Sequence, residues 1–109
     1  MRFLISVIDS EARSQHTPEE VAAIDDFNEF LVAKGYRILA VGLEDPKSAK
    51  VFDYRTGENS ITSGPFLAAS EFTSGIWMID VPTLEVAEEL AAQGSQACNR
   101  RVELRAIIG

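Results

Sequence analysis

The sequence predicts an α+β protein with a ferredoxin-like arrangement, in the order βαβ, hairpin, βαβ. Alternating apolar residues, many of them β-branched, predict strands near the start, the middle and the end of the chain. Two segments with helical spacing lie between these strands. Right-handed crossovers would place both helices on one face of an antiparallel sheet. The 109 residues fit a single domain, expected over residues 1–109.

The strands are predicted from period-two alternation. Four sheet strands are expected, at residues 2–8, 36–43, 75–81 and 101–108. Residues 50–55 and 60–62 flank the turn Thr56-Gly57-Glu58-Asn59 and predict a short hairpin. Residues 9–15 and 63–74 are expected to be irregular.

The helices are predicted from their capping residues. Thr17 can cap the first helix, Pro18 needs no donor in the first turn, and Glu20 completes a capping box. Gly35 is expected to end this helix. The second helix is expected to begin after Thr83 and to end at Gly94.

Most of the predicted strands are apolar on both faces. In the first strand, the alternation sets Leu4 and Ile8 against a second apolar series made of Phe3, Ile5 and Val7. One layer of helices covers only one face of a sheet. The other face would expose more apolar surface than the few hundred Å² that a monomer usually shows. We therefore expect a homodimer that packs sheet to sheet.

Composition excludes several classes of function. A formal charge of −7 argues against a nucleic-acid partner, because phosphate binding needs a clustered positive field. The first apolar run is too short to span a bilayer and lacks a signal-peptide cleavage site, so no membrane partner is expected. Cys98 is the only cysteine, which suits a reducing compartment and predicts a cytoplasmic protein. With one histidine and one cysteine, no metal or other cofactor is predicted.

Two titratable residues are candidate catalytic groups. Asp9 follows the first strand and could abstract a proton if burial raised its pKa. His16, the only histidine, has an ordinary pKa of about 6.5 and lies just before the first helix. The alternative for both is a solvated surface role. Cys98 has no histidine nearby in sequence and is expected to be a structural thiol.

A second group of candidates lies in the segment Ser63-Gly64-Pro65-Phe66. These residues could form the mouth of a ligand pocket, with Gly64 allowing close backbone approach and Phe66 forming a wall. The alternative is a turn capped by Ser63 and stiffened by Pro65.

The last strand carries the third group, Arg101, Glu103 and Arg105, on one face. Arginine binds carboxylates in a bidentate manner, so one hypothesis is a site for a small anionic ligand. The alternative is an ion-pair network between strands or between the subunits of the dimer.

An ordered set of motifs runs along almost the whole chain. It includes the helix start Thr17-Pro18-Glu19-Glu20, the Gly64-Pro65-Phe66 motif with Glu71 behind it, and the closing Val102-Glu103-Leu104-Arg105. In these motifs the chain resembles the YCII-related family, and specifically its DGPF-motif branch. The resemblance implies a dimeric α/β barrel of ferredoxin-like protomers and adds Glu71 to the candidate ligand-binding residues. Some related members look like small-molecule enzymes with a His–Asp pair, and some DGPF relatives are encoded beside or fused to extracytoplasmic-function sigma factors.

The chain departs from this family pattern mainly in the charged cluster. Ser63 stands where the family has Asp before Gly-Pro-Phe, and Ala68 and Ser70 stand where Glu and Lys follow it. The helix position of the catalytic histidine carries no histidine, and Ala106 replaces the closing proline.

Three functions remain as hypotheses, and catalysis is left open. The first, favoured by the depleted charged cluster, is a small-ligand-binding or accessory homodimer. The second is an enzyme of proton transfer or elimination on an anionic or aromatic metabolite, with Asp9 or His16 as base and Arg101 and Arg105 orienting the substrate. The third is a regulatory partner of another protein, a sigma factor by family analogy.

Overall fold

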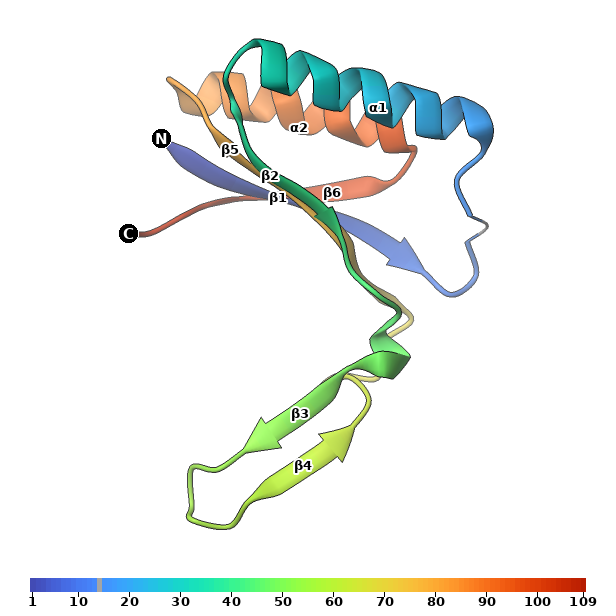
Figure 1. Ribbon diagram of the computed structural model, residues 1–109, viewed down its shortest axis with the longest axis vertical. Coiled ribbons are helices and arrows are strands. Elements are labelled where there is room, and N and C mark those ends of the chain that lie inside the picture. Colours follow the sequence, from blue (N-terminus) through green and yellow to red (C-terminus); the bar gives the residue numbers. More distant parts are fainter. Residues whose placement is uncertain (14) are drawn as a thin grey trace.

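A computed structural model describes residues 1–13 and 15–109 of the chain. Four antiparallel strands form one sheet in the order β2-β5-β1-β6, and a separate hairpin pairs β3 with β4. Both helices cover one face of the four-stranded sheet (Figure 1). The elements are β1 (Arg2–Ser10), α1 (Pro18–Ala33), β2 (Arg37–Gly42), the short 3₁₀ helix η1 (Pro46–Ser48), β3 (Lys50–Asp53), β4 (Ser60–Ser63), β5 (Glu71–Asp80), α2 (Leu84–Cys98) and β6 (Arg101–Ala106). The α+β, ferredoxin-like prediction is thus confirmed.

The core lies between the sheet and the helices. Its fully buried members come from β1, β5 and both helices, and the largest of them are Ile5, Leu31, Ile79 and Cys98. Alternation along β1 buries Phe3, Ile5 and Val7, as the sequence predicts. None of the described helices is long and apolar enough to cross a membrane.

Helix α1 begins and ends as predicted. Thr17 accepts a hydrogen bond from the backbone N–H of Glu20, and the Glu20 side chain accepts one from the backbone N–H of Thr17, which completes the capping box. Lys34 is the C-cap residue, and Gly35 follows with a φ of 71°, a conformation that glycine adopts at no steric cost.

The predicted end of α2 is wrong. Thr83 caps its start, but the helix continues through Gly94 to Cys98, and Asn99 caps its end with a φ of 53°. Gly94 is buried, and a Cβ atom at this position would lie 3.3 Å from the Phe27 ring and 3.4 Å from Trp77. This glycine therefore allows the helix to pack closely against aromatic rings, and it does not end the helix.

Two strands begin or end outside their predicted limits. Strand β1 extends through Asp9 to Ser10, and β5 begins at Glu71, although both segments were expected to be irregular. The two extensions pair with each other beyond a register shift near Val7 and Gly75. The end of β1 and the start of β5 stabilise each other in extended form by this pairing. The local sequence of either segment does not show that the other strand lies beside it.

The face of the sheet opposite the helices, called the open face here, is apolar over β1, β2 and β5. Register places Leu4 beside Met78 and Val41 beside Ile76 on this face, and Leu39 lies next to Met78. Leu39 and Val41 are exposed and the others are partly buried. The predicted second apolar face is therefore present, and no part of the described chain covers it.

The β3–β4 hairpin projects away from the four-stranded sheet. It extends on the side opposite the helices, so that it hangs beyond the open face (Figure 1). It pairs only within itself, with Lys50 opposite Ser63 and Phe52 opposite Ile61.

Candidate functional site

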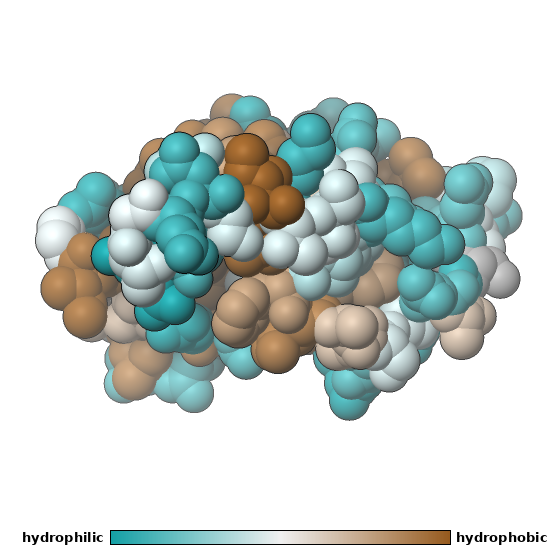
Figure 2. Space-filling model, turned by 90° about the horizontal axis from the view of Figure 1, so that it is seen from below, coloured by the Kyte–Doolittle hydropathy of each residue, from teal (hydrophilic) through white to brown (hydrophobic). Residues whose placement is uncertain are grey.

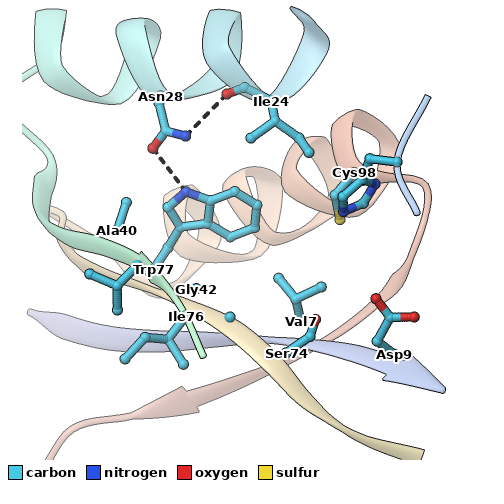
Figure 3. Close-up of a pocket in the computed structure, with 13 residues that line it drawn as sticks. Val7, Asp9, Ile24, Asn28, Ala40, Gly42, Ser74, Ile76, Trp77 and Cys98 are labelled. Carbon is cyan, nitrogen blue, oxygen red and sulfur yellow. Dashed lines mark hydrogen bonds between the residues drawn. The ribbon is translucent and has the colours of Figure 1, made fainter. Parts of the chain in front are cut away.

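A cavity of about 380 Å³ lies between the helices and one end of the sheet. Side chains from β1, β2, β5, α1 and α2 surround it (Figure 3). Its walls are mainly apolar, and they include Val7, Ile24, Ala40 and Trp77. Its polar lining consists of Asp9, His16, Asn28 and Ser74, with the thiol of Cys98 beside them. We call this cavity the helix–sheet pocket.

Trp77 forms a fixed wall of the pocket. Its indole Nε1 donates a hydrogen bond to Oδ1 of Asn28 at 3.0 Å, and Nδ2 of Asn28 donates to the carbonyl of Ile24 at 3.1 Å (Figure 3). The Trp77 ring also meets Phe27 edge to face, with 5.1 Å between the ring centroids. Through these two bonds Asn28 fixes the orientation of the tryptophan ring at the wall of the pocket.

One glycine of a facing pair lets β2 and β5 approach each other beside the pocket. Gly42 and Gly75 face each other in the register, and a Cβ atom on Gly75 would lie 3.1 Å from the carbonyl oxygen of Val41. A side chain at position 75 would therefore push the two strands apart. A Cβ atom on Gly42 would meet only an ordinary contact, 3.8 Å from the carbonyl oxygen of Ser74.

Asp9 lies at the end of β1 and lines the pocket. Its Oδ1 accepts a hydrogen bond from the backbone N–H of Ser10 at 2.9 Å, and its Oδ2 lies 3.3 Å from Nε of Arg100. The side chain of Arg100 is only 4% exposed and that of Asp9 is 19% exposed. Arg100 also donates to the carbonyl of Asn99 at 3.1 Å. This buried ion pair fixes the carboxylate and joins the end of β1 to the turn after α2.

Arg100 is a residue of the pocket region that is not among the site residues predicted from the sequence. The alternation of the last strand does indicate its position. Val102 and Leu104 lie on the helix side of the sheet, and Arg100, two residues before Val102, is expected on the same side. The same rule applies to Asp9, which continues the buried series of Ile5 and Val7.

His16 lines the same pocket from the segment before α1, and it is partly buried. Its Nδ1 lies 3.3 Å from Oε1 of Glu20. The other oxygen of that carboxylate accepts a hydrogen bond from the Asn99 side chain at 2.9 Å. When Nδ1 carries the proton shared with Glu20, Nε2 of His16 is an acceptor.

Hydrogen bonds lower the pKa of Glu20 to about 2, the backbone N–H of Thr17 contributing most and Asn99 next. The capping glutamate is therefore ionised at neutral pH and holds the imidazole beside the pocket.

Cys98 behaves as a structural thiol. It is fully buried, and its Sγ lies 3.8 Å from the carbonyl of Ser95. Burial raises its pKa, which keeps the sulfur protonated and weakly nucleophilic.

The remaining candidate residues lie away from this pocket. Ser63, Gly64, Pro65 and Phe66 are at the base of the β3–β4 hairpin and do not line the pocket. Gly64 has a φ of 100°, and its N–H donates to the carbonyl of Ala49 at 2.7 Å. Phe66 is strongly exposed. A ligand role for this segment stays a prediction.

The charged residues of the last strand lie on the open face. Arg101, Glu103 and Arg105 pair with Ile8, Ser6 and Leu4 of β1 in the register. Arg101 forms an ion pair with Glu71, which reaches it from β5. This contact favours the ion-pair network over the anion site. Within residues 1–13 and 15–109, no group of three or more His, Cys, Asp or Glu side chains could hold a metal ion.

A family model described as the YCII-related domain matches residues 1–108. The match is at the level of the family, so the DGPF-motif branch stays a prediction. No curated protein sequence matches the chain.

Proposed function

The chain belongs to the YCII-related family, and we propose that it binds a small ligand in the helix–sheet pocket and works as a homodimer. One observation carries this proposal: Asp9 and His16, separated in sequence, line a single cavity whose other walls are mainly apolar. A volume of about 380 Å³ lies within the range of small-molecule sites, roughly 300–1,000 Å³.

The lining suggests the chemistry of the ligand. Trp77, Ile24 and Val7 offer an apolar surface with an aromatic wall, which suits a flat or hydrocarbon body. The carboxylate of Asp9 accepts hydrogen bonds, so a hydroxyl or amino group of the ligand fits beside it. A phenol or an aromatic amine meets both requirements. An anion that relied on Arg105 would have to bind elsewhere, because Arg105 lies on the open face.

The homodimer is supported by the open face. Leu39, Val41, Ile76 and Met78 form an apolar area that no described part of the chain covers. A second copy packed on this face would remove it from water, which is the main favourable term in most protein association. The charge pattern and the single cysteine are compatible with a cytoplasmic dimer.

Proton transfer is a second candidate function. The pairing of His16 with the Glu20 carboxylate resembles the arrangement that orients a catalytic imidazole. Both oxygens of Asp9 already have partners, so His16 is the better candidate for the base. A regulatory role through another protein stays a prediction.

A thermal-shift series tests ligand binding. Phenols, aromatic amines and small carboxylates are added at roughly 0.1–1 mM, the range of many metabolite affinities. Ala40→Leu fills the pocket without removing a charge, and Asp9→Asn removes the acceptor charge. Arg105→Ala on the open face is the matched control.

We expect at least one phenol or amine to raise the melting temperature of the wild type. Ala40→Leu should abolish this shift, and Asp9→Asn should weaken binding at least tenfold. Arg105→Ala should leave the affinity unchanged. Hits whose affinity depends on Arg105 and not on Ala40, or no hits at all, would contradict the proposal.

A further inference from the structure

The β3–β4 hairpin, Lys50–Ser63, is called the arm here, and three of its apolar side chains are more than half exposed. Phe52 lies opposite Ile61 in the register, and Tyr54 follows directly after the end of β3. These side chains are 63%, 54% and 52% exposed, respectively. An isolated two-stranded hairpin is marginally stable in water. The arm therefore lacks the packing that would keep it ordered on its own.

The dimensions of the subunit point to contacts with another molecule. Its radius of gyration is 16.0 Å, whereas a compact chain of this length has a value of about 13 Å. Its accessible surface is 7598 Å², against about 6,000 Å² expected for a monomer of this mass. The excess is about twice the ~800 Å² that each partner buries in a standard interface. One interface on the open face would therefore leave part of the excess uncovered.

The position of the arm indicates where its contact lies. The arm projects on the side of the sheet opposite the helices (Figure 1). A second copy that packs on the open face would occupy the same side. Figure 2 views the molecule from this side, and apolar residues are visible across the middle of the surface.

Charge is compatible with such a contact. Between residues 50 and 63, two basic residues (Lys50 and Arg55) balance two acidic ones (Asp53 and Glu58), so the net charge of −7 belongs to the rest of the chain. Arg55 binds Asp53 within the arm, with 2.8 Å between Nη2 and Oδ2. A neutral arm can approach an acidic second copy without the repulsion that two acidic surfaces would meet.

We propose that the arm of each subunit clasps a second copy of this chain, with Phe52, Tyr54 and Ile61 packed against the body of the partner. This inference rests on the proposed homodimer, and it adds a second contact region to the open face. It also gives the uncovered arm a role that ligand binding in the pocket does not require.

Sedimentation equilibrium and isotope-filtered NOE spectroscopy on the full chain test the clasp. The double variant Phe52→Ser/Ile61→Ser removes the apolar face of the arm, and Leu39→Glu disrupts the open face. Val21→Ser changes an exposed apolar residue of α1 that lies on neither surface. NOEs are measured in dimers formed from one labelled and one unlabelled copy.

We expect Phe52→Ser/Ile61→Ser to raise the dimer dissociation constant at least tenfold, with Val21→Ser unchanged. We also expect NOEs between the arm of one copy and the body of the other. A wild-type dimer without such NOEs, whose dissociation constant is unaffected by the double variant, would overturn the clasp and leave the open-face dimer standing. A wild type that stays monomeric would overturn both, while the ligand series would still decide on the pocket.

Discussion

Arg100 and Arg13 donate to the same carbonyl, that of Asn99, from very different surroundings. Arg100 is buried and pairs with Asp9, whereas Arg13 is exposed and forms its 2.7 Å hydrogen bond at the surface. Removing one partner of a buried ion pair leaves an uncompensated charge, and this typically costs about 3–5 kcal/mol. A charged side chain that makes its contact at the solvent-exposed surface contributes only about 0–1 kcal/mol to the free energy of unfolding. The two arginines therefore offer a matched comparison.

We predict that Arg100→Ala lowers the free energy of unfolding by about 3 kcal/mol and that Arg13→Ala lowers it by less than about 1 kcal/mol. Urea denaturation followed by circular dichroism measures both. The double variant Arg100→Ala/Asp9→Ala should recover part of the loss, because no lone charge remains. Equal effects of the two single substitutions would contradict the structural role given to Arg100.

Glu20 predicts a pH dependence of stability. Its pKa is about 2 in the folded chain, against an ordinary value of 4.5, because Thr17 and Asn99 donate to its carboxylate. A lowered pKa means that the folded state binds this proton less readily than the unfolded state does. The stabilisation is therefore fully present above about pH 4.5 and is lost as the pH falls towards 2.

Glu20→Gln should accordingly flatten the fall in melting temperature between roughly pH 5 and pH 3. This is the range in which the Glu20 carboxylate begins to lose its stabilising effect, given its folded and unfolded pKa values. The neighbouring Glu19→Gln serves as the control, since Glu19 makes no capping bond to Thr17. An identical acid profile for Glu20→Gln and the wild type would exclude the capping carboxylate as a source of acid sensitivity.

At the scale of the elements, the close approach of β2 to β5 depends on one glycine of a facing pair. Gly75→Ala would place a methyl group against the backbone of Val41, and a backbone atom cannot move aside as a flexible side chain can. We predict a loss of about 1–3 kcal/mol, as for an overpacked site. Gly42→Ala meets no such obstacle and should be neutral or slightly stabilising. Chemical denaturation of the two variants makes the comparison.

Ligand affinity is a second readout of the same pair, because both glycines lie beside the pocket. Any ligand found in the thermal-shift series should bind Gly75→Ala more weakly than Gly42→Ala. A larger loss of stability for Gly42→Ala would show that the register between β2 and β5 has been assigned incorrectly.

The elements differ in how far the sequence predicts them. The start of α1 is determined by Thr17, Pro18 and Glu20, which act within one turn, so local reasoning finds it. The end of α2 is predicted wrongly at Gly94 because this glycine makes room for Phe27 and Trp77, which are distant in sequence. The start of β5 at Glu71 likewise depends on pairing with Ser10 of another strand.

The candidate site likewise combines features that local sequence shows with features that depend on residues distant in sequence. Asp9 and His16 could be named from their chemistry, but only the fold shows that they line one pocket. Arg100 and Asn28 were not named, since their roles are to hold Asp9 and Trp77 in place. Side chains that position other side chains carry little signal in a single sequence.

For the whole molecule, the two uncovered apolar regions have a thermodynamic consequence. If folding of the arm and burial of the open face occur only in the dimer, then native subunits associate with each other and unfolded chains do not. Association then stabilises the fold by mass action, and the melting temperature must increase with protein concentration. A monomer whose unfolding is two-state would melt at the same temperature at every concentration.

We therefore predict that the melting temperature of the wild type rises by about 5–10 °C over a hundredfold increase in concentration. RT ln 100 is about 2.7 kcal/mol for each dimer, or about 1.4 kcal/mol for each subunit, and 1 kcal/mol shifts the melting temperature of a domain of this size by about 4–8 °C. Leu39→Glu should abolish this rise, because the buried charge opposes association on the open face. Differential scanning calorimetry measures both. A wild type whose melting temperature does not depend on concentration would mean that the exposed leucine, valine and aromatic side chains of the open face and the arm are tolerated in water by a single subunit.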